Sequence, residues 1–294
     1  MAFKKILVPV DFSDFSDKAV EYAIFIAEKF CAEMTLLHAV ILFEEDFDEK
    51  EQLQAYEKII QKKENERTKK LESHCKAAET RGLRVNSALI RGVSTADSIL
   101  NYISDKNFDL VVMGTHGRTG LKRLMLGSVT ERVVGFSPIP VLTIHRDLKK
   151  PGIKKILIPI DFSEHSKIAV KRGIAIAEEF NAALEFLHVV EMHDHPEFYT
   201  INSDPILEAN PGLEHHITEN MITLTGIPGE KATYSVKEGK VYKEIKMAAE
   251  NNTIDLIVMA THGMSELEHF LVGSNSERVV RTASCPVLTV RRNG

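Results

Sequence analysis

The sequence predicts an α/β protein made of two tandem Rossmann-like or flavodoxin-like domains, each a parallel sheet with flanking helices. Two observations support this fold class. Short apolar runs alternate with longer helical segments, as in doubly wound folds, and the whole pattern occurs twice. The chain has 294 residues, 44% of them hydrophobic, which is enough for two buried cores.

The repeat is visible at both ends of each copy. Residues 4–20, KKILVPVDFSDFSDKAV, match residues 154–170, KKILIPIDFSEHSKIAV. Further on, FDLVVMGTHG at 108–117 matches IDLIVMATHG at 254–263. A period of this length is a whole domain, so the chain is a duplication and not a solenoid.

A polar linker separates the two copies. Residues 146–152 read RDLKKPG and end in Pro-Gly, which interrupts regular structure. We therefore expect one domain over 1–146 and a second over 152–294.

The first copy alternates strands and helices in chain order. Strands are expected at 6–10, 34–40, 84–90, 109–114 and 140–145, which are short apolar or alternating runs. Helices are expected from Ser13 or Asp14, either of which can serve as a cap, to about Phe30, over 49–80, from Thr95 to about Asp105, and after Gly127. This alternation predicts right-handed crossovers between parallel strands.

Composition excludes several classes of protein. The net charge of -5 argues against nucleic acid as the main partner, because such proteins usually carry a basic footprint. Three widely spaced cysteines give no disulfide framework or zinc knuckle. The N-terminus does not resemble a signal peptide, and no stretch approaches the ~20 apolar residues of a membrane span. We expect a cytoplasmic protein without a membrane partner.

Two residues mark a ligand site at the carboxyl edge of the sheet. Asp11 follows the first strand, and Ala39 lies at the end of the second. Ligands of open α/β sheets bind at this edge, where the strand order reverses. Taken alone, Asp11 would be as well explained as a helix cap.

A glycine loop follows the fourth strand of the first copy. Gly114, Gly117 and Gly127 are spaced G-2x-G-9x-G, and Ser128 follows. Glycines allow close approach of a ligand, and a helix start at Ser128 would favour phosphate. Basic side chains within the loop would oppose phosphate charge: Arg118, Lys122 and Arg123. Neither a Walker loop nor a dinucleotide fingerprint is present.

The glycine motif occurs in both copies, and nearly the whole chain resembles the universal stress protein family. The resemblance implies five-stranded parallel sheets in the order 3-2-1-4-5, and ATP accompanied by Mg²⁺ or Mn²⁺. No obvious carboxylate ligand for that ion stands in the glycine loop. The residues that the resemblance assigns to ATP in the first copy are Pro9, Asp11, Ala39, Met113, Gly114, Gly117, Gly127, Ser128 and Val129.

The second copy carries a degenerate motif. It keeps Pro159, Asp161, Val189, Met259, Gly263, Gly273 and Ser274. Ala260 replaces Gly114, which is a mild change unless the position needs a positive φ, and Asn275 replaces Val129. Glu266 and Glu268 stand where the first loop is basic. We expect the second copy to bind ATP weakly, to prefer a less charged ligand, or to bind something else. Alternatively, both glutamates simply face solvent.

For the remaining histidines and for the long helix, we favour a structural role over a binding role. His38 and His188 are expected to be core histidines. His116 is expected to support its loop, with contact to the nucleotide as the alternative. A histidine-rich insert, His193, His195, His215 and His216, is expected to be an irregular solvated loop, with a zinc site as the alternative. The stripe Leu53, Tyr56, Ile60, Arg67 and Leu71 indicates that helix 49–80 covers the sheet, with a partner-binding face as the alternative.

Three functions are compatible with these observations. The first is an ATP-binding regulator of a stress response, the second a slow ATPase or phosphoryl-transfer enzyme, and the third a scaffold for another ligand. We favour the first, because no catalytic base or nucleophile stands out. By resemblance, the strands at 140–145 and 286–291 would pair the two domains, and a homodimer is a further expectation.

Overall fold

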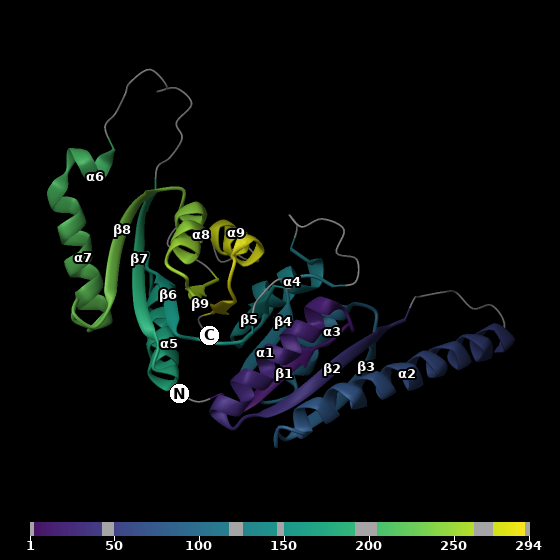
Figure 1. Ribbon diagram of the computed structural model, residues 1–294. Coiled ribbons are helices and arrows are strands. Elements are labelled where there is room, and N and C mark those ends of the chain that lie inside the picture. Colours follow the sequence, from purple (N-terminus) through teal and green to yellow (C-terminus); the bar gives the residue numbers. More distant parts are fainter. Residues whose placement is uncertain are drawn as a thin grey trace, which may run out of the picture. The chain divides into compact units, whose positions relative to one another are not determined.

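The computed structural model contains two compact units, Ala2–Pro151 and Gly152–Gly294. The residues that it describes are 3–42, 50–117, 126–145, 150–191, 205–261 and 273–291. Each unit is a parallel sheet flanked by helices, as the sequence predicts (Figure 1). No helix in the described part of the chain has the length and hydropathy to cross a membrane.

The first unit has the predicted strand order. Its strands are β1 (Lys5–Pro9), β2 (Glu33–Ile41), β3 (Val85–Gly92), β4 (Leu110–Gly114) and β5 (Val141–Ile144). They pair in parallel in the order β3-β2-β1-β4-β5. The described helices are α1 (Asp14–Phe30), α2 (Lys50–Glu79), α3 (Thr95–Ser104) and α4 (Ser128–Phe136).

The helices of this unit form two layers. In Figure 1, α1 and α2 lie in front of the sheet, and ion pairs link Asp17 to His74 and Glu28 to Arg81 between them. The chain reverses direction across the sheet after β3, so right-handed crossovers place α3 and α4 on the other face. The order therefore switches between β1 and β4, where such sheets bind ligands.

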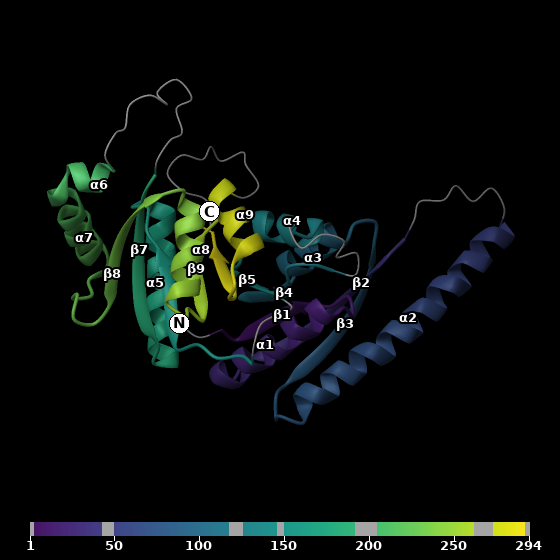
Figure 2. The same cartoon turned by 45° about the horizontal axis from the view of Figure 1, so that its top comes forward.

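The second unit repeats this arrangement. Its elements are β6 (Lys155–Pro159), α5 (Glu164–Phe180), β7 (Ala183–Glu191), α6 (Ile206–Ala209), α7 (Pro211–Thr225), β8 (Thr233–Gly239), α8 (Val241–Asn251), β9 (Leu256–Ala260), α9 (Ser274–Thr282) and β10 (Val287–Val290). Its strands pair in parallel in the order β8-β7-β6-β9-β10. In both views α7 lies beside β8 (Figures 1 and 2).

One sequence prediction in this unit is wrong. The stretch containing His215 and His216 was expected to be an irregular loop, but it belongs to α7. Pro211, a residue type that often interrupts helices, occupies the first turn of this helix. Proline is tolerated there because it has no N–H to leave unbonded and its φ already suits a helix.

Matched residues begin and end the first helix of each unit. Ser13 caps α1, and its hydroxyl accepts a hydrogen bond from the Ser16 backbone N–H; Ser163 caps α5 in the same way. Cys31 and Asn181 close these helices in the left-handed conformation, with φ of 53° and 51°. The two units thus share local geometry as well as topology.

The residue before each cap has an unusual backbone. Phe12 and Phe162 have φ of 62° and 63°, in the left-handed region that bulky residues rarely occupy. Each ring lies against a strand histidine: Phe12 against His38, with centroids 4.8 Å apart, and Phe162 against His188 at 5.0 Å. The turn after the first strand is therefore built identically in both units.

Candidate functional site

A cavity of about 440 Å³ lies at the carboxyl edge of the first sheet. This volume is within the range of small-molecule sites. The structure brings to it every described residue that the resemblance assigns to ATP in the first copy: Pro9, Asp11, Ala39, Met113, Gly114, Gly117, Gly127, Ser128 and Val129. Arg118, Lys122 and Arg123 lie outside the described residues.

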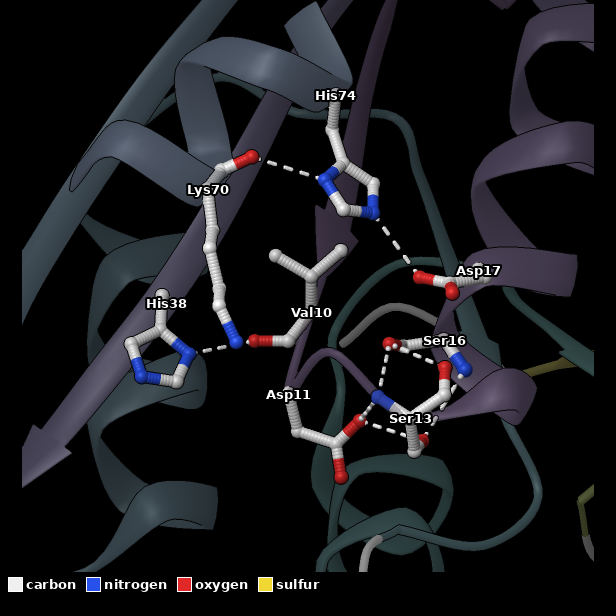
Figure 3. Close-up of polar contacts among 8 residues, drawn as sticks. All are labelled: Val10, Asp11, Ser13, Ser16, Asp17, His38, Lys70 and His74. Carbon is white, nitrogen blue, oxygen red and sulfur yellow. Dashed lines mark hydrogen bonds and ion pairs between the residues drawn. The ribbon is translucent and has the colours of Figure 1, made fainter. Parts of the chain in front are cut away.

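Asp11 is held in place by the turn that starts α1. Its Oδ1 accepts hydrogen bonds from the Ser13 backbone N–H at 3.0 Å and the Ser13 hydroxyl at 2.6 Å (Figure 3). Its Oδ2 lies so close to Gly117 that a Cβ there would be 2.8 Å away. The carboxylate therefore supports the turn and also borders the cavity beside the glycine loop.

The start of α4 forms the opposite part of this border. Gly127 precedes the helix, no described side chain caps it, and the Gly127 N–H donates to Thr115 O at 2.9 Å. The Thr130 hydroxyl donates to Gly114 O at 2.8 Å and so fixes the helix start against the end of β4. Because Ser128 and Val129 line the cavity, N–H groups of the first turn border it with the positive end of the helix dipole.

Gly114 is required for close packing. Its φ lies outside the left-handed range, but a Cβ there would lie 2.9 Å from Phe15 Cβ and 3.0 Å from Phe15 O. Ala260 at the matched position of the second unit carries such a Cβ. An alanine at position 114 of the first unit would therefore be opposed by steric contact with Phe15, and not by backbone conformation.

Three histidines make structural contacts, but of the two that were expected in the core, His38 is buried and His188 is only partly buried. His38 Nδ1 is 2.7 Å from Val10 O, and His188 Nδ1 is 2.7 Å from Ile160 O. His116 Nδ1 is 3.1 Å from Thr115 Oγ1 and its ring packs against Phe15. Both His38 and His116 also line the cavity, so their supporting roles place imidazole rings beside any ligand.

Sequence reasoning missed part of the cavity wall. The unassigned residues include Lys63 and Arg67 from α2, and Thr95 and Ile99 from α3. A signal for Arg67 was present, because a guanidinium interrupts an otherwise apolar stripe of its helix. From the sequence, that stripe indicates a helix that covers the sheet, with a partner-binding face as the alternative, and neither interpretation assigns Arg67 to the cavity. Of its members Ile60 and Leu71 are buried, whereas Arg67 reaches the cavity.

Two groups of polar contacts hold α2 beside the cavity. Arg91 of β3 donates to both Glu64 oxygens, at 2.6 and 2.9 Å, and to Glu57 at 2.9 Å. Hydrogen bonding to Arg91 keeps the pKa of Glu64 below its ordinary value. Further along α2, His74 bridges Lys70 O and Asp17 Oδ1 on α1, each at 2.9 Å (Figure 3).

The second unit reproduces much of this geometry. Asp161 Oδ1 accepts from Ser163 at 3.0 and 2.6 Å. The Gly273 N–H donates to Thr261 O at 2.8 Å, and α9 begins at Ser274. Of the other predicted residues, Pro159, Val189 and Met259 lie in β6, β7 and β9, respectively. Gly263, Glu266 and Glu268 are outside the described residues.

The histidine insert is only partly described. His215 and His216 are exposed on α7, and His193 and His195 lie outside the described residues. Within the described ranges, no three His, Cys, Asp or Glu side chains are grouped as metal ligands would be.

Comparisons with known proteins agree with the fold. The profile of the Universal stress protein family matches residues 2–145 and 152–291. A universal stress protein of Methanocaldococcus jannaschii is 36% identical over 148 residues, covering 50% of this chain and 85% of the relative. One of Synechocystis is 26% identical, covering 98% of this chain and 100% of the relative. The crystal structure of a universal stress protein from Archaeoglobus fulgidus superposes with a TM-score of 0.70 at 22% identity, covering 99% and 98% of the two chains.

Proposed function

Since the chain belongs to the universal stress protein family, with two such domains in tandem, we propose that it is an ATP-binding regulator of a stress response. ATP is held mainly by the first domain, at the cavity described above. The bound nucleotide then sets the contacts that the protein makes with partners. Mg²⁺ or Mn²⁺ arrives with the phosphates.

The observation that carries this proposal is the convergence of the glycine loop, Asp11 and the start of α4 on one cavity. The uncapped helix start supplies N–H donors and a favourable dipole for phosphate. Asp11, beside Gly117, is placed to accept from ribose hydroxyls or the base. The cavity's apolar lining, including Pro9 and Met113, suits an adenine ring.

Isothermal titration of the nucleotide-stripped protein with Mg-ATP tests the proposal. We expect one tight site per chain. Gly127→Ala should weaken that site about tenfold or more, because its Cβ would lie 3.2 Å from Thr115 O where the helix start is fixed. Gly273→Ala, the matched change in the second domain, should leave the tight site intact.

Other outcomes discriminate among the alternatives. Two similar sites, each removed by one of the two glycine substitutions, would contradict the asymmetry but keep the ATP function. No binding would contradict the ATP function and favour a scaffold for another ligand. ATP hydrolysis that persists through repurification but is lost in Ser128→Ala would favour the enzyme.

A further inference from the structure

Two basic side chains border the cavity from the α2 side. Lys63 and Arg67 line it from α2, whereas Gly127 and Ser128 line it from the start of α4. Because α2 and α4 cover opposite faces of the sheet, these two sets approach the cavity from opposite directions. The site described from sequence thus has a second, cationic wall.

Lys63 and Arg67 set the sign of the summed formal charge of the described residues that line the cavity. Among its described lining residues, Lys63 and Arg67 are the groups with a permanent positive charge and Asp11 is the carboxylate. With both basic side chains present, the formal charge of the lining is +1 (two minus one). Without them it would be -1, and an anionic ligand would face a net repulsion.

Arg67 can face a ligand because the carboxylate nearest to it on the helix is already paired with another residue. Its natural partner on the helix is Glu64, three residues earlier, but Glu64 is bound at both oxygens by Arg91. The Arg67 guanidinium lies instead over the Phe12 ring, 5.4 Å from its centroid. No carboxylate in the described parts of the chain forms an ion pair with Arg67 or Lys63.

The second domain lets the two walls be compared. Gly114 corresponds to Ala260, an offset of 146 residues (260 minus 114). The same offset relates Leu71 to Ile217, on α2 and α7, and both side chains are buried. The two helices therefore present equivalent faces to their sheets.

At this offset the basic wall is absent from the second domain. Arg67 corresponds to Leu213 of α7, and the Lys63 position falls at Ala209, which ends the separate helix α6. Asp161, the counterpart of Asp11, is retained. The two domains therefore differ in charge at this helix as well as in the loop after the fourth strand of each sheet.

We infer that Lys63 and Arg67 are ligand-binding residues of the first domain and that they select a ligand carrying several negative charges. The identity of that ligand as a nucleotide rests on the proposed function. On this inference the first domain prefers a nucleoside polyphosphate to the uncharged nucleoside, and α2 contributes to that preference.

Titration of the full-length protein with Mg-ATP, adenosine and inorganic tripolyphosphate tests this inference. Arg67→Gln combined with Lys63→Gln should weaken ATP and tripolyphosphate binding tenfold or more and reduce the salt dependence of both. Adenosine binding should stay unchanged. The matched control is Lys62→Gln with Lys69→Gln, which removes the same charge from α2 outside the cavity and should bind as the wild type does.

The possible results separate this inference from the proposed function. Equal ATP affinity in the double variant, its control and the wild type would overturn the inference and leave ATP binding intact. Tripolyphosphate binding that needs Arg67 and Lys63, without ATP binding, would support the inference and overturn the proposed function. If the wild type binds neither ATP nor tripolyphosphate, both the inference and the proposed function are overturned. Thermal unfolding of each variant checks that the fold is retained.

Discussion

At the residue scale, the site leaves no room for a side chain between Asp11 and Gly117. Asp11 Oδ1 is bound by Ser13 while Oδ2 faces the glycine loop. A side chain at Gly117 would have to displace a carboxylate that the turn holds in place. The need for glycine here arises from the neighbour across the cavity edge, so spacing alone could not reveal it.

Gly117→Ala tests this contact. Its Cβ would meet Asp11 Oδ2 at 2.8 Å, so we expect ATP affinity to fall about tenfold, or roughly 1.4 kcal/mol. The free energy of unfolding should change little, because the Gly117 φ suits an L-residue. Gly152→Ala, with nothing within 4 Å, is the control. Unchanged affinity in Gly117→Ala would show that the ligand does not depend on Asp11.

At the element scale, the position of α4 depends on one hydroxyl. Thr130 joins the first turn of α4 to the last carbonyl of β4, and Ser276 makes the same contact to Ala260 O at 2.9 Å in the second unit. A hydroxyl is thus present at this point in both units although the residue differs.

Thr130→Val tests this connection with almost no change in shape. It leaves Gly114 O without its donor in a buried place, so we expect a loss of about 1–2 kcal/mol in the free energy of unfolding. ATP affinity should fall several-fold because the helix start is less well fixed. Thr130→Ser, which copies Ser276, should restore both quantities. Equal stability of the Val and Ser variants in urea would contradict the role of the hydroxyl.

The elements themselves were largely predictable. Apolar runs such as Ile6, Leu7 and Val8 are fully buried in β1, and such a run predicts a strand that is covered on both faces. The helical insert of the second domain was not predictable in the same way, because Pro211 supports either a loop or a first helical turn. Arg67 was missed because its approach to the cavity depends on Glu64 being bound by β3, which is a tertiary contact.

At the scale of the whole molecule, the two units share a turn, caps and strand order but differ in their buried ionisable groups. Cys285 lies in the core of the second unit, where burial, and to a smaller extent Asp255, raises the pKa of its thiol to about 12 from 9.0. Cys75 in the first unit is also raised, again mainly by burial. Native and unfolded chains therefore hold thiol protons differently at alkaline pH.

The sign of this effect gives a pH prediction. A thiol pKa raised by folding contributes stability that is present below pH 9 and is lost as pH rises toward 12. From pH 8.5 to about 10.5, we expect Cys285 to account for a loss of roughly 2 kcal/mol. Urea unfolding across this range should show a shallower decline in Cys285→Ala than in wild type. Cys31→Ala, at an exposed thiol, should decline like the wild type; identical slopes for all three would refute the prediction.

The duplicated helix end offers a practical use of the second copy. Cys31 and Asn181 close the same turn of two equivalent helices, and asparagine is the residue type better suited to a left-handed φ. A residue found at a matched position of one copy is therefore one that the same backbone conformation accepts in the other copy. Exchanging Cys31 for Asn would remove the exposed thiol while borrowing a residue from the protein itself. A label introduced elsewhere would then face only the buried Cys75 and Cys285 as competitors.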